Sequence, residues 1–383
     1  MKKIKVMAVF GTRPEAIKMA PLVMELSSRP GIRSICCLTG QHREMLDSVM
    51  QIFRLKADYD LNIMEKNQTL SGITTRTITG MDAVIDEARP DLILVHGDTS
   101  TTFAGALSAF YHKVPIGHVE AGLRTYDKYS PYPEEMNRTL VGDMADLHFA
   151  PTEANAANLR REAVRGEIFV TGNTAIDAMK TTVRKDYRFA DDSLNALDFT
   201  GKRVIVVTCH RRENYGKPME QIMHAIREVA ASHPDVEVVY PVHPSPTVRE
   251  YAFGILGGVP GIHLIDPVDV EQMHNLLSRC YMVMTDSGGL QEEAPALGKP
   301  VLVLRRETER PEAVAAGTAR LAGVERETIV SMADELLDDE GAYAKMAHAV
   351  NPYGDGFACR RIAQAIEWHF GLTEKRPDDF RPA

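Results

Sequence analysis

The sequence predicts an α/β protein with two Rossmann-like domains, each built on a doubly wound parallel sheet. Three observations support this prediction. Short apolar segments alternate with helical segments, an order typical of parallel sheets with helices on both faces. The alternation lapses in the polar stretch 185–202 and then restarts. The chain has 383 residues, which exceeds the usual size of a single hydrophobic core.

In the first half, strands are expected where short apolar runs end in polar turns. These runs lie at 4–10, 35–38, 92–96, 116–119, 147–150 and 168–170. Pro14 follows the first run and suits the first position of a helix. We expect the N-terminal domain to span residues 1–172. A last helix at about 357–372 is expected to pack back on this domain.

In the second half, the same pattern predicts five further strands. They lie at 204–208, 236–242, 262–265, 281–284 and 300–304. We therefore expect the C-terminal domain to span residues 173–356.

The segment 281–304 reads as a strand, a glycine-rich turn, a helix and a second strand. At such a turn the first N–H groups of the helix lack carbonyl partners and, with the helix dipole, attract an anion such as phosphate. Ser287 can add a hydroxyl donor, while Gly288 and Gly289 allow a ligand close to the backbone. Glu293 lies one turn into the helix, where its carboxylate could accept hydrogen bonds from a sugar diol. The turn suits a nucleotide, although a turn shaped only for packing has the same spacing.

Composition argues against several classes of function. The net charge is −9, from 44 basic and 53 acidic residues, so binding to nucleic acid or a membrane surface is not indicated. No apolar stretch approaches the roughly 18 residues of a membrane span. The apolar N-terminal run is too short for a signal peptide, and we expect a cytoplasmic protein. The five cysteines lack C-x-x-C spacing, which argues against structural zinc or a disulfide framework.

The motifs of common cofactors are missing as well. The sequence has no G-x-G-x-x-G after the first strand, no G-x-x-x-x-G-K-[ST] and no H-E-x-x-H. We therefore expect neither a cofactor nor a metal. The remaining reactive side chains are the acid–base candidates Asp98, Glu120, Glu134, Glu135 and His210, and the arginines Arg13, Arg211, Arg212 and Arg310. This inventory fits proton removal with a departing phosphate better than hydride transfer or acylation.

Polar side chains repeatedly follow the carboxyl ends of the predicted strands. They are Arg13, His42, Asp98, Glu120, His210, His243 and Ser287. Open parallel sheets bind ligands at this edge, and in two domains facing each other both edges would line one cleft. Strand ends are often polar turns in any case, so each residue alone is ambiguous. The joint pattern favours a functional site.

Seven segments, taken together, resemble a known family. They are GTRPEAIK (11–18), HGDT (96–99), HVEAGLRT (118–125), PEEMNR (133–138), HRREN (210–214), DSGGLQEEAPALGKPVLVLR (286–305) and ERPEA (309–313). In this order they resemble the bacterial non-hydrolysing UDP-N-acetylglucosamine 2-epimerases, over nearly the whole chain. One departure is Cys209, which stands where a glycine usually precedes HRREN.

The resemblance implies a GT-B-like fold with the nucleotide sugar between the domains, no cofactor, and a homodimer. It implies interconversion of UDP-N-acetylglucosamine and UDP-N-acetylmannosamine, by elimination of UDP to a 2-acetamidoglucal and re-addition. The product would supply N-acetylmannosamine units for cell-surface polysaccharide. The residues that match the family's catalytic group are Asp98, Glu120, Glu134 and His210. Those that match its UDP contacts are Arg13, Lys18, Ser287, Gly288, Gly289, Glu293 and Arg310.

Bacterial members of the family also carry an activator site for UDP-N-acetylglucosamine. The positions that resemble it are Gln41, His42, Arg43, Arg211 and His243. Glu44 and Asn67 depart from the glutamine and the basic residue expected beside them.

Three alternatives stay open at the level of sequence. A GT-B glycosyltransferase would share the fold and the segment 287–293, but it would need an acceptor and not the carboxylates. A hydrolysing epimerase would release UDP and free N-acetylmannosamine. A non-catalytic nucleotide-sugar sensor would use closure of the domains as its output.

Overall fold

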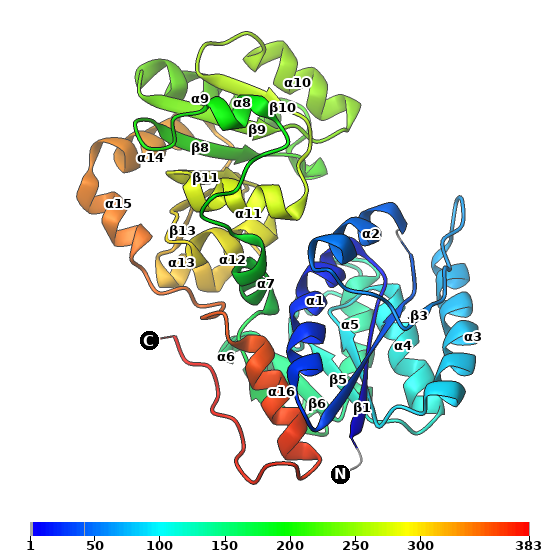
Figure 1. The fold of residues 1–383 in the computed structure, drawn as a ribbon. Helices are drawn as coiled ribbons and strands as arrows, with labels where there is room; N and C mark the ends of the chain where they lie inside the picture. Colours follow the sequence, from blue (N-terminus) through cyan, green and yellow to red (C-terminus); the bar gives the residue numbers. More distant parts are fainter. Residues whose placement is uncertain (1–2, 42, 383) are drawn as a thin grey trace. The chain divides into compact units, whose positions relative to one another are not determined.

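The computed structural model describes residues 3–41 and 43–382. The chain divides into two compact units. Unit 1 takes in the residues up to Thr181 together with Tyr353–Arg381, and unit 2 takes in Thr182–Pro352 together with Pro382 (Figure 1). Within the described ranges, no helix is both long and apolar enough to span a membrane.

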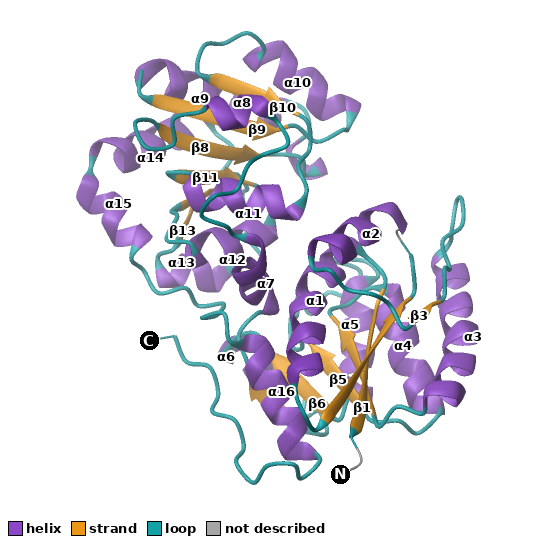
Figure 2. Ribbon diagram, viewed as in Figure 1, coloured by secondary structure: helices purple, strands orange, loops and turns teal. Residues whose placement is uncertain are grey.

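Unit 1 is a parallel sheet with helices on both faces (Figure 2). Over the described residues its seven strands follow the order β3-β2-β1-β4-β5-β6-β7. The strands are β1 Ile4–Phe10, β2 Ile32–Leu38, β3 Tyr59–Asp60, β4 Leu92–His96, β5 Ile116–Val119, β6 Leu147–Ala150 and β7 Glu167–Val170. The helices are α1 Arg13–Ser28, α2 Arg43–Ile52, α3 Leu70–Ala88, α4 Ser100–Tyr111, α5 Glu134–Met144, α6 Glu153–Arg161, α7 Thr174–Thr182 and α16 Ala358–His369.

Strand β1 illustrates how this sheet is buried on both faces. Val6, Ala8 and Phe10 face a core formed with α1, α2 and α16. Met7 and Val9 face a second core formed with α3, α4 and α5. Because side chains alternate between the faces of a strand, a continuous apolar run indicates a strand covered on both sides.

The last helix, α16, packs on α1 within unit 1 (Figure 1). Ile362 and Ile366 of α16 are fully buried in the same core as Leu22 and Leu26 of α1. The chain therefore leaves unit 1, builds unit 2, and returns to complete the first core.

Helix α7 is joined to the start of α16. The carboxylate of Asp177 accepts hydrogen bonds from the N–H groups of Ala358 and Cys359, at 3.1 and 2.9 Å. Since this contact ties α7 to unit 1, the boundary falls after Thr181 and not at 172–173, where the sequence analysis puts it.

Unit 2 is a second parallel sheet, also with helices on both faces (Figure 2). Over the described residues its six strands follow the order β10-β9-β8-β11-β12-β13. The strands are β8 Arg203–Thr208, β9 Val236–Pro241, β10 Ile262–Ile265, β11 Met282–Thr285, β12 Val301–Val303 and β13 Ala319–Leu321. The helices are α8 Asp192–Ala196, the 3₁₀ turn Arg212–Asn214, α9 Lys217–Ser232, α10 Pro246–Leu256, α11 Val270–Arg279, α12 Gly288–Ala296, α13 Pro311–Ala316, α14 Arg326–Asp338 and α15 Glu340–Ala347.

Every strand predicted from the sequence is present, with ends that differ by a few residues. The sequence does not predict β3 or β13. Strand β3 has two residues, which pair with Cys37 and Leu38. A strand of two residues is too short to show the alternation of apolar and polar side chains that predicts a strand. Strand β13 has three residues, Ala319–Leu321, around a central arginine.

In each sheet the strand order reverses at one point. The reversal lies between β1 and β4 in unit 1, and between β8 and β11 in unit 2. Ligands of open parallel sheets bind outside the carboxyl ends of the strands at such a point. Functional side chains are therefore expected in the loops that follow these four strands.

Candidate active site

In unit 1, a buried carboxylate joins the loops after β1 and β4. One oxygen of Glu15, in the first turn of α1, accepts hydrogen bonds from the N–H groups of Gly11 and Thr12 at 3.1 and 2.8 Å. Its other oxygen accepts from the hydroxyl groups of Thr99 and Thr102, at 2.8 and 3.0 Å. Glu15 thus fixes the two loops to each other where the strand order reverses. Sequence reasoning misses this residue, although the T-x-x-E spacing of a capping box signals it.

Helix α1 also presents two of the predicted cations. Arg13 is its first residue and is half-buried, and Lys18 forms an ion pair with Glu120 after β5. The carboxylate of Glu120 accepts from Nδ2 of Asn173 at 3.1 Å and lies 3.6 Å from Nε2 of His96. Burial alone would raise the pKa of Glu120, but Lys18 and His96 outweigh it and hold this pKa well below its usual value. Glu120 is therefore ionised at neutral pH.

Asp98 follows β4 and has the opposite electrostatic character. Its Oδ2 pairs with Nη2 of Arg138 at 2.8 Å, and its backbone carbonyl accepts from Nδ2 of Asn137 at 2.9 Å. Burial raises the pKa of Asp98, and Arg138 opposes that rise. The charges of Glu120 and Glu134 add to the rise in this pKa. The three carboxylates thus lie close enough to sense one another's charge.

Two adjacent glutamates open α5, and they differ in their contacts. Glu135 is buried and accepts from the N–H group of Thr125 at 3.0 Å and from that of Tyr126 at 2.8 Å. It also lies 3.5 Å from Nη1 of Arg138. Glu135 therefore holds the loop before α5, which removes it from the acid–base candidates. Glu134 is half-buried and influences the pKa of Asp98.

In unit 2, a second buried carboxylate joins the loops after β8 and β11. Oδ2 of Asp286 accepts from the N–H groups of His210 and Arg211, both at 2.8 Å, and from Nδ2 of Asn214 at 3.2 Å. Oδ1 of Asp286 lies 3.4 Å from Nδ1 of His210. Asp286 therefore holds the β8 loop and faces one ring nitrogen of the predicted catalytic histidine. Sequence reasoning misses this role because its partners lie far away in the chain.

The ring of His210 is partly exposed and stacks on that of His243. Their centroids are 5.1 Å apart and the planes differ by 8°. Burial lowers the pKa of His210, Asp286 opposes this effect, and His243 and Arg211 add to it. The net shift is downward, so the imidazole is mostly neutral at pH 7. With Nδ1 facing a carboxylate oxygen, the proton is favoured on Nδ1, and Nε2 is left as the basic nitrogen.

The glycine-rich turn opens α12 and has two guanidinium groups beside it. Ser287 is the residue before the helix, and its N–H group donates to Oγ1 of Thr285 at 2.9 Å. A Cβ atom at Gly288 would lie 3.9 Å from Nη2 of Arg211 and 3.9 Å from Cζ of Arg310. The N–H groups at the start of α12 and these two cations suit a phosphate.

The same arginines belong to a network of ion pairs. Arg310 pairs with the buried Glu292, and Nη1 of Arg211 lies 3.8 Å from Oε1 of Glu309. Nη2 of Arg305 lies 3.3 Å from that same oxygen. Burial alone would raise the pKa of Glu309, but Arg305 and Arg211 lower it overall. The acids hold the guanidinium groups in place around the turn.

Glu293 lies one turn into α12 and beside the glycines. A Cβ atom at Gly289 would lie 3.7 Å from Oε1 of Glu293. Its Oε2 lies 3.5 Å from Nε2 of the buried His274 on α11. Sequence reasoning misses His274, because a lone histidine in an amphipathic helix carries no motif.

The residues of the predicted activator site are divided between the units. In unit 1, the backbone carbonyl of Gln41 accepts from Nε2 of Gln68 at 3.1 Å. Arg43 pairs with Asp60, and with Asp47 at 3.1 Å. His42 lies outside the described residues, as does the side chain of Glu44. In unit 2, Arg211 and His243 adjoin His210, as described above.

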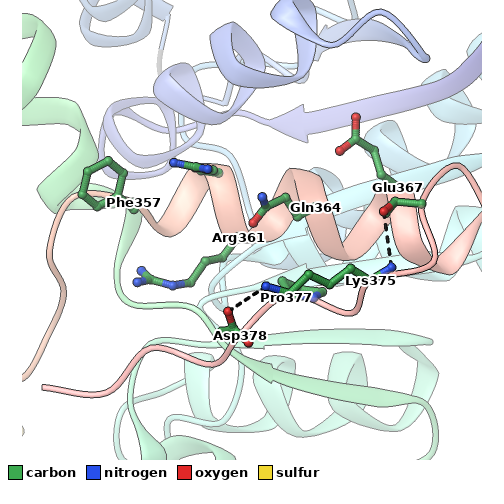
Figure 3. Close-up of a pocket in the computed structure, with 9 residues that line it drawn as sticks. Phe357, Arg361, Gln364, Glu367, Lys375, Pro377 and Asp378 are labelled. Atoms are coloured by element: carbon green, nitrogen blue, oxygen red, sulfur yellow. Dashed lines mark hydrogen bonds and ion pairs between the residues drawn. The ribbon is translucent and has the colours of Figure 1, made fainter.

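A groove of about 410 Å³ lies elsewhere in unit 1, between α16 and the C-terminal segment (Figure 3). Its charged side chains are already paired in two places, Lys375 with Asp378 at 3.1 Å and Arg361 with Asp355 at 2.7 Å. None of the predicted site residues that the structure describes lines this groove. The size of this groove alone does not make it a better candidate for the active site than the strand ends, where the predicted acid–base residues lie.

Anions are the ligands that these side chains are best suited to hold. Within 3–41 and 43–382, no group of three His, Cys, Asp or Glu side chains is placed to bind a metal ion. The donors at the start of α12, with Arg310 and Arg211, are suited to phosphate oxygens.

Comparisons with known proteins agree on one family. The sequence profile of the family described as UDP-N-acetylglucosamine 2-epimerase matches residues 24–367. The chain is 54% identical over 382 residues to UDP-N-acetylglucosamine 2-epimerase of Bacillus subtilis, covering 99% of each. A UDP co-structure of S. aureus MnaA aligns with a TM-score of 0.89, 51% identity and complete coverage of both chains. UDP-GlcNAc 2-epimerase of Neisseria meningitidis bound to UDP-GlcNAc aligns with a TM-score of 0.83 and 46% identity, covering 95% of this chain and 99% of that one. The predicted class, two parallel-sheet α/β domains of the GT-B-like kind, is confirmed.

Proposed function

The chain belongs to the UDP-N-acetylglucosamine 2-epimerase family, and we propose that it interconverts UDP-N-acetylglucosamine and UDP-N-acetylmannosamine without releasing the free sugar. One observation carries the proposal: in unit 1, Asp98 after β4 interacts with Glu120 after β5 and with Glu134 at the start of α5, and in unit 2 an arginine-lined helix start follows β11. The relatives solved with UDP and with UDP-GlcNAc support the choice of ligand.

We assign the nucleotide to unit 2. The diphosphate would accept hydrogen bonds from the backbone at Gly288 and Gly289, from the Ser287 hydroxyl, and from Arg310. The ribose hydroxyl groups would donate to the carboxylate of Glu293. Arg13 and Lys18 of unit 1 would add positive charge where the diphosphate departs.

The proposed reaction follows from the weak acidity of the substrate. C2 carries no adjacent carbonyl, so its hydrogen is hard to remove as a simple proton. If the C1–O bond breaks as a base takes the C2 proton, the C–H electrons form a C1=C2 double bond and the C–O electrons leave with UDP. Re-addition of UDP to the resulting 2-acetamidoglucal, with protonation of C2 on the other face, gives the epimer. The chemistry needs two proton carriers and a stabilised leaving group.

The electrostatics support a proposal in which the acids have different tasks. Asp98 has the raised pKa, so its carboxylate is the stronger base and the best candidate to exchange a proton with C2. Glu120, held ionised by Lys18, orients that cation and stabilises positive charge. Nε2 of His210 supplies a second proton carrier, held by Asp286. Glu134 adds negative charge that keeps the pKa of Asp98 high.

Proton NMR in heavy water tests the proposal. Incubation with UDP-N-acetylglucosamine should place deuterium at C2 of both epimers, because both pass through the glucal. Free N-acetylmannosamine accumulating with UDP would instead identify a hydrolysing enzyme. A non-catalytic sensor would bind UDP and leave the C2 hydrogen in place.

Further assignments rest on the resemblance. We propose that the enzyme is a cytoplasmic homodimer whose product supplies N-acetylmannosamine units for cell-surface polysaccharide. We also propose activation by UDP-N-acetylglucosamine through Gln41, His42, Arg43, Arg211 and His243. Rates measured from UDP-N-acetylmannosamine, with and without trace UDP-N-acetylglucosamine, test the activation, and sedimentation tests the dimer.

A further inference from the structure

His274 on α11 is a buried histidine placed between two functional segments. Its side chain is 1% exposed. Its Nδ1 lies 2.7 Å from Oγ1 of Thr182, and its Nε2 lies 3.5 Å from Oε2 of Glu293. Within the described ranges Nε2 makes no hydrogen bond, so a buried polar nitrogen faces the carboxylate without a closed contact. Buried polar atoms are nearly always paired, and such an exception calls for an explanation.

The ring of His274 can satisfy both neighbours at once. An ionised carboxylate only accepts hydrogen bonds, so contact with Glu293 requires a proton on Nε2 of His274. In the neutral ring Nδ1 then accepts, and the hydroxyl group of Thr182 can donate to it. The threonine contact is therefore compatible with the tautomer that can hold Glu293.

Thr182 is where the chain enters unit 2, and it is fastened to α11. Nδ2 of Asn275 donates to the Thr182 carbonyl at 2.7 Å, and the N–H group of Arg184 donates to Oδ1 of Asn275 at 2.8 Å. His274 and Asn275 thus hold the entering segment 182–184, and His274 alone also faces the nucleotide turn.

We propose that His274 is a positioning residue for nucleotide binding, acting through Glu293, and that it couples this carboxylate to the segment 182–184. A ribose that draws Glu293 into position would close the contact between Nε2 and Oε2. The stabilisation from this hydrogen bond would reach Thr182 through its contact with Nδ1 of His274. This inference rests on the proposed function, because it takes Glu293 as a contact of the nucleotide.

Two substitutions of His274 separate its two nitrogen atoms. The amide of asparagine reaches about as far as Nδ1, and that of glutamine about as far as Nε2. We expect His274→Asn, which loses the group facing Glu293, to raise the Kd for UDP about fivefold, as for a lost hydrogen bond. His274→Gln should restore most of that affinity. A merely structural role would make the two variants equal in Kd once folding is verified by thermal melting.

Hydrogen exchange measures the coupling. In the wild-type protein, saturating UDP should slow exchange of the amides in 182–184. Thr182→Val keeps the shape of the side chain and removes the hydroxyl group, so this protection should be lost. His263→Asn, which breaks a 2.7 Å contact with Glu237 elsewhere in unit 2, is the matched control and should change neither Kd nor protection.

The outcomes distinguish the inference from the proposed function. If the wild-type protein shows no affinity for UDP by calorimetry, the proposed function fails. If UDP binds and Glu293→Ala weakens it while His274→Asn does not, the positioning role is overturned and the function stands. Unchanged protection of 182–184 in Thr182→Val would overturn the coupling.

Discussion

At the scale of single residues, Asp98 and Glu120 are two acids of one cluster with pKa values shifted in opposite directions. A raised pKa means that the folded state favours the protonated form. The stability from Asp98 is therefore present below its ordinary pKa and is lost as pH rises through the raised value. The lowered pKa of Glu120 has the opposite effect. The stability that Glu120 contributes to the folded protein is present above its ordinary pKa and is lost as pH falls through the lowered value.

This difference predicts that two similar substitutions change stability in opposite directions. At pH 7, Asp98→Asn should raise the free energy of unfolding, because it removes a charge that folding disfavours. Glu120→Gln should lower it, because it leaves Lys18 without its carboxylate. Both should reduce kcat, Asp98→Asn by roughly a hundredfold or more, the scale of a general base. Urea unfolding at pH 7 and an epimerisation assay measure these effects. Equal destabilisation by both variants would contradict the opposite shifts of the two pKa values.

Substitution of Glu15 should reduce activity, although no contact with substrate is assigned to this residue. Glu15→Gln keeps the shape of the side chain but places an NH₂ group among hydrogen-bond donors, because each carboxylate oxygen accepts at least two bonds. We expect a loss of about 1–3 kcal/mol in the free energy of unfolding, the scale of a buried unsatisfied group, together with a lower kcat. The control Glu25→Gln on the same helix affects only the partly exposed pair with Arg29 and should cost less than about 1 kcal/mol. Equal unfolding curves for the two variants would contradict the account of Glu15.

At the scale of elements, the start of α12 allows a substitution that should weaken binding of UDP without affecting folding. A Cβ at Gly288 would meet its neighbours at 3.8–3.9 Å, which is ordinary contact, so Gly288→Ala should fold normally. The methyl group would occupy the space beside Arg211 and Arg310 that we assign to phosphate. We expect the Kd for UDP to rise at least about tenfold, with Tm nearly unchanged. Calorimetry and thermal melting check this.

Gly254→Ala is the matched control for the Gly288 substitution. It lies within α10, where an added Cβ meets nothing within 4 Å. Replacing a helix-interior glycine should stabilise the protein by about 0.4–1 kcal/mol and leave UDP affinity alone. If Gly288→Ala bound UDP as tightly as Gly254→Ala, the turn would not be the phosphate site.

The elements were predictable from sequence where one segment suffices to define them. Strand β1 is an apolar run because both faces of the sheet are covered, and that pattern is visible in seven consecutive residues. The glycine turn of α12 is likewise local. Strand β3 has two residues and depends on pairing with β2, so no local pattern marks it.

The supporting residues of the site were not predictable in this way. Glu15 matters because it bonds to Thr99, Asp286 because it bonds to the His210 loop, and His274 because it meets Thr182. Each of these partners lies far away in sequence, and a single sequence carries no signal of such contacts, although the capping-box spacing marks Glu15 itself. The motifs locate the residues expected to contact substrate, whereas only the fold locates the residues that hold them in place.

At the scale of the whole molecule, unit 1 is assembled from two separate parts of the chain. Its core needs Ile362 and Ile366 of α16, which are synthesised after the segment Thr182–Pro352 that contains the core of unit 2. The segment beyond α16 adds a smaller contribution. Phe380 is buried beside Leu159 and Val170, and its N–H group donates to the Val170 carbonyl at 2.7 Å.

Two truncations should therefore have graded effects. A chain ending at residue 352 lacks α16 and should fail to fold unit 1, while unit 2, whose core lies within Thr182–Pro352, keeps that core. A chain ending at residue 371 keeps α16 and loses Phe380, which should cost about 2–3 kcal/mol, the scale of one buried aromatic side chain. Limited proteolysis followed by mass spectrometry should show early cleavage throughout residues 3–181 in the first case only. Resistance of that region in the shorter chain would mean that α16 is not needed for the core of unit 1.

Because the acids Asp98, Glu120 and Glu134 belong to unit 1, the shorter chain should also lose epimerase activity. If its unit 2 folds alone, it should still bind UDP through α12.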